Sequence, residues 1–414
     1  MKVQEDITHP SERTKTLVLY TNSFPFEETE LSFILPELNI VSQYFSKVYI
    51  IAKSSGSVVC QLPQNCEPIS FENILEKGDS LSVKSNVTSL LRAQVAQVGL
   101  RSLVHFRYLR AYFNGIIDEA SALHHYLKEQ ELLGMNTTHY SYWMSDWATL
   151  ISLIKPQGFK ITRAHGFDLY NERSQFGFQL LRDFQIQNLD FIASISNLGK
   201  SYLKDSQGAP EHMIGIYHMG IQAFKSGSLK DEKFHILSCS SAIPLKRLDL
   251  ILRLLAKTGL ELLWTHVGDG PELPKIKSLA RDESSAKIEF NFLGRLSQDE
   301  LRDLYESSFF DLFINLSETE GVPVSIMEAI SAGVPVLACN VGAVSEVVPD
   351  SDLLLEKDFD LDFAVTKLKQ VLSSGYTRDK KTRSNVQDFW AQHFDAAQNY
   401  HSFAQTLSQH SSET

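Results

Sequence analysis

Short apolar runs alternate along this chain with longer stretches that carry apolar residues at helical spacing. Apolar runs of this length are typical of buried strands, and intervening helices are the crossovers that parallel strands require. The first series predicts strands at 17–20, 48–52, 138–142, 160–164, 191–194 and 213–217. The second predicts strands at 235–239, 262–267, 287–292, 311–315, 336–338 and 353–355. We therefore expect an α/β chain with two parallel sheets.

Two sheets require two domains, and the chain is long enough for both. Its 414 residues, 43% of them hydrophobic, can form two full cores. The polar stretch 224–233 contains Gly and Ser and is the natural linker. We expect an N-terminal domain at 1–223 and a C-terminal domain at 224–385. The final segment, about 386–408, has the apolar spacing of amphipathic helices.

Composition excludes several classes of protein. A net charge of -11 argues against a general nucleic-acid binder. The four cysteines show no metal-ligand spacing and are too few for a disulfide framework. Cys239 and Cys339 lie in or beside apolar runs, which predicts buried thiols in a reducing compartment. The polar N-terminus and the lack of a long apolar run predict neither a signal peptide nor a membrane span. We expect a cytoplasmic protein.

Two carboxylates, Glu320 and Glu328, flank a Gly-Val-Pro turn after the apolar run 309–316. Pro323 and Gly333 predict the start and the end of a helix of about three turns. Glu320 then lies in the loop and Glu328 on the helix, while the free amides of the first turn form an anion site. Alternatively, Glu328 is a solvated helix residue and Glu320 a capping residue.

The segments 320–323, 328–329, 333–336 and 342–346 read Glu-Gly-Val-Pro, Glu-Ala, Gly-Val-Pro-Val and Gly-Ala-Val-Ser-Glu. This string resembles the C-terminal signature of the family 4 retaining glycosyltransferases of GT-B fold, of the bacterial exopolysaccharide and lipopolysaccharide type. The resemblance implies two Rossmann-like domains with parallel sheets facing a cleft, and a C-terminal helix that crosses back to the first domain. It also implies metal-independent transfer of a sugar from a nucleotide diphosphate sugar to a glycan or glycolipid, with no further cofactor, in cell-surface polysaccharide synthesis.

The resemblance also assigns the donor site. Glu320 would contact hydroxyls of the donor sugar, and Glu328 those of the nucleotide ribose. The Gly-Asp-Gly-Pro-Glu turn at 268–272 and the Phe-Leu-Gly loop at 292–294 resemble segments of the same site, the second receiving the nucleobase through its backbone. The remaining donor-binding residues are Gly321, Val322, Pro323, Val324, Ser325, Gly268 and Leu293.

A basic pair should neutralise the donor diphosphate. Lys246 stands at the family's Lys position, but Ser241 stands where the family has Arg. Because a departing diphosphate needs its charge stabilised, this difference weakens the site unless Arg247 replaces the missing guanidinium. Alternatively, Arg247 is a solvated residue at the start of a helix.

In the first half, 163–170 reads Arg-Ala-His-Gly-Phe-Asp-Leu-Tyr and resembles the family's His-Gly-x-Asp segment. It implies that His165 orients the donor sugar, whereas a lone His after a strand more often braces a loop. Asp168 either holds this turn or contacts the acceptor. The loop with Asn22 and Ser23, together with Glu30 on the following helix start, resembles the acceptor-binding region of these transferases.

Residues 81–117 include no acidic residue, and basic residues alternate there with aromatic and aliphatic ones. This pattern suits an interfacial helix on an anionic membrane, through residues 84–113, that presents a lipid-linked acceptor. The alternative is a helix pair that packs on the sheet with solvated cations. The basic residues are Lys84, Arg92, Arg101, Arg107 and Arg110.

Three further interpretations remain open. The Asp-x-Asp strings at 358–362 lie where a helix begins, which favours capping over a metal site. Ser241 in place of Arg also fits a non-catalytic GT-B subunit that stabilises an active partner. A sugar-nucleotide epimerase would share the fold and the diphosphate site.

Overall fold

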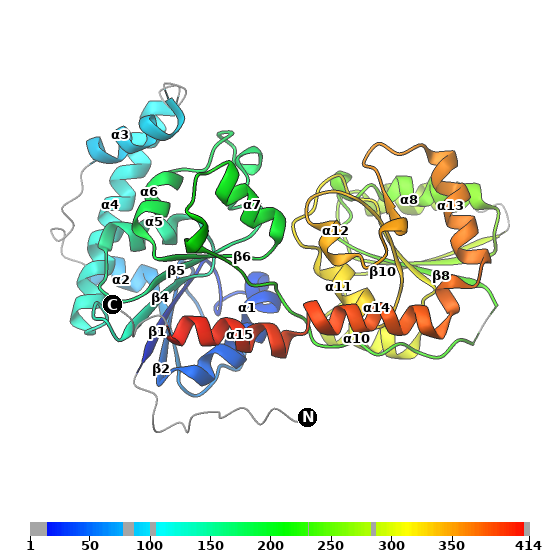
Figure 1. Cartoon of the computed structure of the whole chain (residues 1–414), viewed down its shortest axis with the longest axis horizontal. Coiled ribbons are helices and arrows are strands. Elements are labelled where there is room, and N and C mark those ends of the chain that lie inside the picture. Colours follow the sequence, from blue (N-terminus) through cyan, green and yellow to red (C-terminus); the bar gives the residue numbers. More distant parts are fainter. Residues whose placement is uncertain (1–14, 78–86, 100–104, 231, 283–286, 410–414) are drawn as a thin grey trace. The chain divides into compact units, whose positions relative to one another are not determined.

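The computed structural model describes residues 15–77, 87–99, 105–230, 232–282 and 287–409, and the chain divides into two compact units (Figure 1). The first contains Met1–Met219 and Ala397–Thr414, and the second Gly220–Ala396. The expected limits at 223 and 386 thus fall at 219 and 397. Helix α14 (Lys380–His393) stays in the second unit, where Gln387 Nε2 donates to the Ser331 carbonyl at 2.9 Å.

The first unit is built on a seven-stranded parallel sheet of order β3-β2-β1-β4-β5-β6-β7. Six of its strands confirm the sequence-based expectation, and β3 was missed. This strand contains Pro68, which a sheet tolerates at its edge, where β3 lies. The strands are β1 (Thr16–Thr21), β2 (Lys47–Ala52), β3 (Cys66–Ser70), β4 (Thr137–Ser141), β5 (Lys160–Ala164), β6 (Phe191–Ser194) and β7 (Ile214–Ile216).

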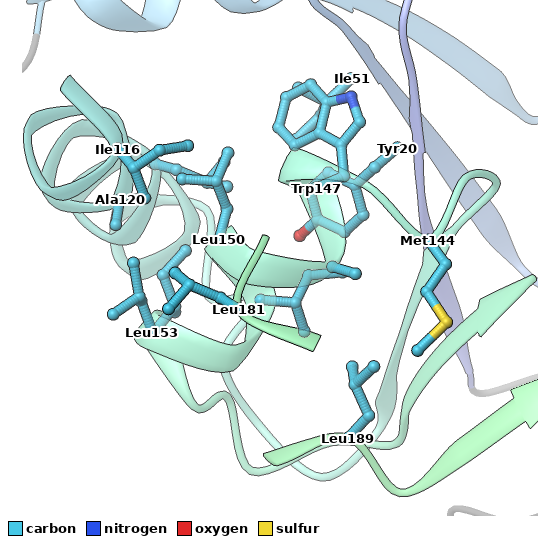
Figure 2. Packing of buried hydrophobic residues seen from close by; sticks show 14 of the residues in the cluster. Tyr20, Ile51, Ile116, Ala120, Met144, Trp147, Leu150, Leu153, Leu181 and Leu189 are labelled. Atoms are coloured by element: carbon cyan, nitrogen blue, oxygen red, sulfur yellow. The ribbon is translucent and has the colours of Figure 1, made fainter. Parts of the chain in front are cut away.

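Side chains alternate across this sheet, so each face has its own core. On one face, Tyr20 packs with Trp147 and with leucines from the neighbouring helices (Figure 2). On the other, Leu17 and Leu19 pack against α1 and α15. The helices of this unit are α1 (Leu31–Val41), α2 (Phe71–Lys77), α3 (Val87–Val98), α4 (Phe106–Glu129), α5 (Asp146–Ile154), α6 (Arg182–Asn188), α7 (Asn197–Asp205) and α15 (Ala396–Gln409).

The second unit repeats the design with a six-stranded parallel sheet of order β10-β9-β8-β11-β12-β13, and all six expected strands are present. The strands are β8 (Phe234–Cys239), β9 (Leu262–Val267), β10 (Ile288–Gly294), β11 (Leu312–Asn315), β12 (Val336–Cys339) and β13 (Leu354–Leu355). Its remaining helices are α8 (Leu248–Thr258), α9 (Leu273–Asp282), α10 (Gln298–Ser307), α11 (Val324–Ser331), α12 (Val344–Val347) and α13 (Leu361–Ser373).

Each sheet has one point where the strand order reverses, between β1 and β4 in the first unit and between β8 and β11 in the second. In open α/β sheets, ligands bind at the carboxyl ends of the strands beside such a point. The fold therefore predicts that ligands bind at the loops that follow these four strands.

Two helix starts can be compared with the sequence. Pro323 is the N-cap of α11, and Gly333, with φ +67°, follows the end of the helix. The helix has eight residues and is therefore shorter than the three turns expected. It ends early because the Val334 amide turns back to the Ala329 carbonyl at 3.0 Å. At α13, Asp360 accepts a hydrogen bond from the Phe363 amide at 2.8 Å, which confirms a capping role.

Candidate functional site

The loops after β8 and β11 meet at the reversal point of the second sheet. Lys246 Nζ lies 2.6 Å from Glu320 Oε1, and Asn315 Nδ2 donates to the same oxygen at 3.0 Å. The backbones also join, because the Glu318 amide donates to the Leu245 carbonyl at 2.9 Å. Two residues expected to hold separate parts of a donor are thus an ion pair. Asn315 was not expected at the site, although a polar residue at the end of an apolar strand is a signal that the sequence contains.

A third loop, after β12, packs against the backbone of Glu320 and Gly321. Gly342 has φ +57°, and a Cβ placed there would lie 2.0 Å from the Glu320 carbonyl oxygen. The next residue, Ala343, donates its amide to the Gly321 carbonyl at 3.1 Å. Only glycine permits this close approach, so the position of Glu320 depends on Gly342.

Glu328 is not a solvated helix residue, because only 5% of it is exposed. Its described side-chain partner is Gln298 Nε2, at 3.2 Å. Burial disfavours the charged form and raises the pKa of Glu328 from 4.5 to about 7. A carboxylate kept out of water with a single weak donor is suited to accepting hydrogen bonds from a ligand.

The loops after β9 and β10 reach the same edge of the sheet. Gly268 has φ +134°, its amide donates to the Gly294 carbonyl at 2.7 Å, and a Cβ there would lie 1.9 Å from the Ser240 carbonyl oxygen. Next to this contact, Ser241 and Leu293 are exposed. The turn after β9 therefore needs glycine for packing against the loop after β8.

Arg247 does not replace the missing arginine at Ser241. Its backbone is left-handed, with φ +48°, and its guanidinium points into the unit. It donates to the carbonyls of Leu316 (2.5 Å), Lys357 (3.0 Å) and Ser317 (3.4 Å), and to Cys339 Sγ (3.0 Å). With four protein partners, Arg247 braces the loops after β11 and β13 and the end of β12. Neither expectation for it, phosphate ligand or solvated residue, describes it.

In the first unit, Glu30 is a buried brace for the loop after β1. Its Oε2 accepts the amides of Asn22 at 3.2 Å, Ser23 at 2.7 Å and Phe24 at 2.9 Å. Its Oε1 accepts the indole N–H of Trp143, which follows β4. Glu30 thus joins the two loops of the reversal point, and its carboxylate is occupied by them. The expectation that it contacts an acceptor becomes a positioning role, with Asn22 and Ser23 as the loop it positions.

His165 and Asp168 form the turn after β5. Asp168 accepts the amides of His165 at 2.8 Å and Met144 at 2.9 Å, so it holds the turn, as one of the two expectations stated. The His165 ring is buried, and neither ring nitrogen has a hydrogen bond among the described residues, Nδ1 lying 3.5 Å from Asp168 Oδ2. Burial lowers the pKa of His165, and Asp168 opposes this effect.

The basic region is only partly described. Lys84 and Arg101 lie outside the described residues, while Arg92 is exposed on α3. At the start of α4, the apolar face packs into the core through Leu109 and Phe113. The opposite face exposes Phe106 and Tyr108 together with Arg107 and Arg110. The packing alternative is therefore correct for one face of α4, and the other face presents aromatic and cationic side chains to solvent.

The described residues contain neither a helix suited to spanning a membrane nor a cluster of metal-ligating side chains. None of the helices in the described ranges is both long and apolar enough to cross a bilayer. The same residues contain no group of three or more His, Cys, Asp or Glu side chains placed to hold a metal ion.

Two parallel sheets with helices define this chain as an α/β protein of GT-B fold. The Anabaena protein HepE, solved in complex with UDP, superposes with a TM-score of 0.67, at 15% identity, over 95% of this chain and 99% of that one. Residues 221–388, nearly the whole second unit, match the family described as glycosyl transferases group 1. The match is confined to this domain, and the first unit lies outside the matched range.

Similar curated proteins include glycosyltransferases of several kinds. The sulfoquinovosyl transferase SQD2 of Arabidopsis thaliana is 31% identical over 27% of this chain and 22% of its own length. The O-antigen biosynthesis glycosyltransferase WbnH of Escherichia coli is 26% identical over 48% of this chain and 56% of its own. The matched region thus spans between about a fifth and a little over half of these relatives.

Proposed function

We propose that this chain is a retaining glycosyltransferase that moves a hexosyl group from a nucleotide diphosphate sugar to a hydroxyl of a glycan or glycolipid. The observation that carries the proposal is the Lys246–Glu320 pair at the reversal point of the second sheet, beside the start of α11. A cation next to an anion-binding helix start suits a diphosphate, and a carboxylate beside it suits sugar hydroxyls.

The donor would be gripped at several points of the second unit. The amides of Val324 and Ser325, in the first turn of α11, have no acceptor among the described residues and can bind phosphate oxygens. Lys246 has one described side-chain partner, Glu320, and an ammonium has three N–H donors. Two of its donors can therefore reach the diphosphate, while Glu328 accepts the paired ribose hydroxyls.

During transfer, the bond between the anomeric carbon and the diphosphate oxygen breaks, and the acceptor oxygen forms the new bond on the same face. The acceptor proton passes to the departing phosphate oxygen, so the atoms balance without a protein base. Lys246 and the α11 amides stabilise the negative charge of the diphosphate, which is why no metal is required in this proposal. Glu320 fixes the hydroxyls of the donor sugar.

The acceptor would be bound in the first unit. The loop with Asn22 and Ser23 is held rigidly by Glu30, and Asp168 holds the adjacent turn. O-antigen synthesis by the similar WbnH protein supports a cell-surface polysaccharide as the product. Exposed Phe106 and Tyr108 beside Arg107 and Arg110 support a cytoplasmic enzyme on the face of an anionic membrane. Sedimentation with anionic and neutral vesicles at low salt tests this location.

The test of function begins with nucleotide binding. Because a ligand of the folded state raises the melting temperature, UDP, GDP and ADP and their hexose derivatives are screened by thermal shift. The donor that binds is then incubated with the chain and with glycan acceptors, with and without EDTA. Retained anomeric configuration, unaffected by EDTA, supports the proposal.

Other outcomes identify the rival functions. A nucleotide sugar with one inverted hydroxyl, formed without acceptor, identifies an epimerase. Absence of both transfer and hydrolysis by the purified chain, for every nucleotide sugar that binds, identifies a non-catalytic subunit.

A further inference from the structure

A row of aromatic rings leads from the core of the first unit to its surface beside His165. The His165 ring lies 5.1 Å from Tyr142 and 4.2 Å from Trp143, measured between ring centroids. Trp143 is in turn 4.9 Å from Phe167. Tyr142 is fully buried, whereas 51% of Phe167 is exposed. The row therefore ends in an aromatic ring presented to solvent.

The exposed end of the row is held in place. Trp143 donates its indole N–H to the buried carboxylate of Glu30. Asp168, next to Phe167, accepts the His165 amide of the same turn and the Met144 amide of the loop that carries Trp143. Gln179 Nε2 donates to the Phe167 carbonyl at 3.1 Å. Since these bonds fix the backbone under Phe167 and the ring next to it, the surface is preorganised for a ligand.

The chemistry of this surface selects a ligand with both an apolar face and hydroxyl groups. The face of an aromatic ring carries partial negative charge, which the C–H groups on one side of a pyranose complement. Both ring nitrogens of His165, behind the row, lack a hydrogen-bond partner among the described residues, and a hydroxyl can both donate and accept. Phosphate is a poor ligand for this surface, because Tyr142, Trp143 and Phe167 carry no positive charge and burial lowers the pKa of His165.

We propose that Phe167 and Trp143 form a stacking subsite for a pyranose residue of the acceptor. The inference rests on the proposed function and extends it by assigning the acceptor's sugar ring to these two side chains. The acceptor, and not the donor, is assigned because Glu30 joins Trp143 to the loop of Asn22 and Ser23. Phe167 is a specificity-determining residue in this arrangement.

The test uses the full chain and the variants Phe167→Ala, Phe167→Tyr and Phe363→Ala. Phe363, on α13 of the second unit, is the matched control, because 58% of it is exposed and it has no part in either proposed site. The probes are the methyl α-pyranosides of glucose, galactose and N-acetylglucosamine, with myo-inositol as a polyol lacking a pyranose ring. Binding is measured by saturation-transfer NMR and titration. UDP, GDP and ADP binding is followed by thermal shift in parallel.

We expect at least one methyl pyranoside to bind through the C–H groups of one ring face, and myo-inositol to bind less. Phe167→Ala should weaken the Kd of that pyranoside at least about five-fold, while Phe167→Tyr and Phe363→Ala leave it unchanged. Nucleotide binding should be the same in all four proteins. We expect Phe167→Ala to remain folded, because the Phe167 ring is exposed and is not part of the core.

Three results would overturn the subsite. The first is equal pyranoside binding by Phe167→Ala and the unaltered chain. The second is nucleotide binding by the unaltered chain without binding of any pyranoside. The third is loss of nucleotide binding in Phe167→Ala, which would assign the Phe167 ring to the donor site. Failure of the proposed function is distinguishable, because no nucleotide would then bind to the unaltered chain.

Discussion

Lys246 and Glu320 are separated by 74 positions in the chain, and their side chains meet at 2.6 Å. The exposed fractions of their side chains are 20% and 10%, so the pair is partly shielded from water. Charges shielded from water interact more strongly than charges at the surface. The pair joins the loop after β8 to the loop after β11. It is the feature of the second unit on which the proposed chemistry depends.

Replacing Lys246 by Met should slow transfer by roughly 10²- to 10³-fold at saturating donor, because one preorganised donor to the developing charge is lost. Donor affinity should fall less, since the α11 amides remain. The measurement is kcat and KM with the donor found by thermal shift. Lys257→Met is the matched control, because Lys257 pairs with Asp362 at the same 2.6 Å on the surface of the same unit. Unchanged turnover in Lys246→Met would exclude the proposed role.

Glu328 should make both stability and nucleotide affinity depend on pH. Its pKa rises from 4.5 to about 7 on folding, so the folded state binds more protons between these values. The free energy of unfolding therefore falls as pH rises through this window and stays low above it. Glu328→Gln should raise stability at pH 8 by on the order of 2 kcal/mol, with little gain near pH 4.5. Urea unfolding at the two pH values measures the difference.

The same substitution should weaken nucleotide binding by about ten-fold or more at pH 8, because the ribose hydroxyls lose a charged acceptor. In the unaltered chain, affinity should increase as pH rises through about 7 and the carboxylate forms. In Glu328→Gln this pH dependence should be absent. Calorimetric titration with nucleotide measures both, and a variant with higher stability and undiminished affinity would contradict the ribose assignment.

Gly342→Ala should reduce both stability and activity. The added Cβ would lie 2.0 Å from the Glu320 carbonyl oxygen, so the loop that carries Glu320 must move. Gly375→Ala is the control, because its φ of +79° is also left-handed but nothing lies within 4 Å of the added carbon. The control should lose about 1 kcal/mol of stability from backbone strain alone. We expect a larger loss and at least about ten-fold slower transfer for Gly342→Ala, from melting curves and initial rates.

Arg163 and Glu37 form a buried ion pair in the first unit, and Tyr140 also donates to Glu37, at 2.9 Å. Burial lowers the pKa of Arg163 to about 10, so the guanidinium stays charged at neutral pH. Arg163→Met should cost about 3–5 kcal/mol, because it leaves a buried carboxylate unpaired. The double variant Arg163→Met/Glu37→Leu should recover part of this loss. Urea unfolding gives the values, and an additive double variant would show that the two charges are not coupled.

Much of the fold could be predicted from local sequence. Twelve expected strands are present, because a buried parallel strand needs a continuous apolar run that is visible in the chain itself. The turn from Glu320 to Pro323 and the cap at Asp360 follow from backbone preferences of single residues. Strand β3 escaped because a Pro-containing edge strand lacks such a run.

The roles of individual site residues depended on contacts between distant segments. The sequence left Arg247 open between a phosphate ligand and a solvated residue, but from its left-handed backbone it donates to the carbonyls of Leu316 and Lys357. Glu30 looked like an acceptor contact, yet three loop amides and an indole occupy its carboxylate.

The sequence by itself determined the strands, the helix starts and the residue types of the site, because these depend on neighbours along the chain. Only the tertiary structure decided that Lys246 pairs with Glu320 and that Glu328 is buried, because the order of strands in a sheet brings together side chains that no local pattern connects.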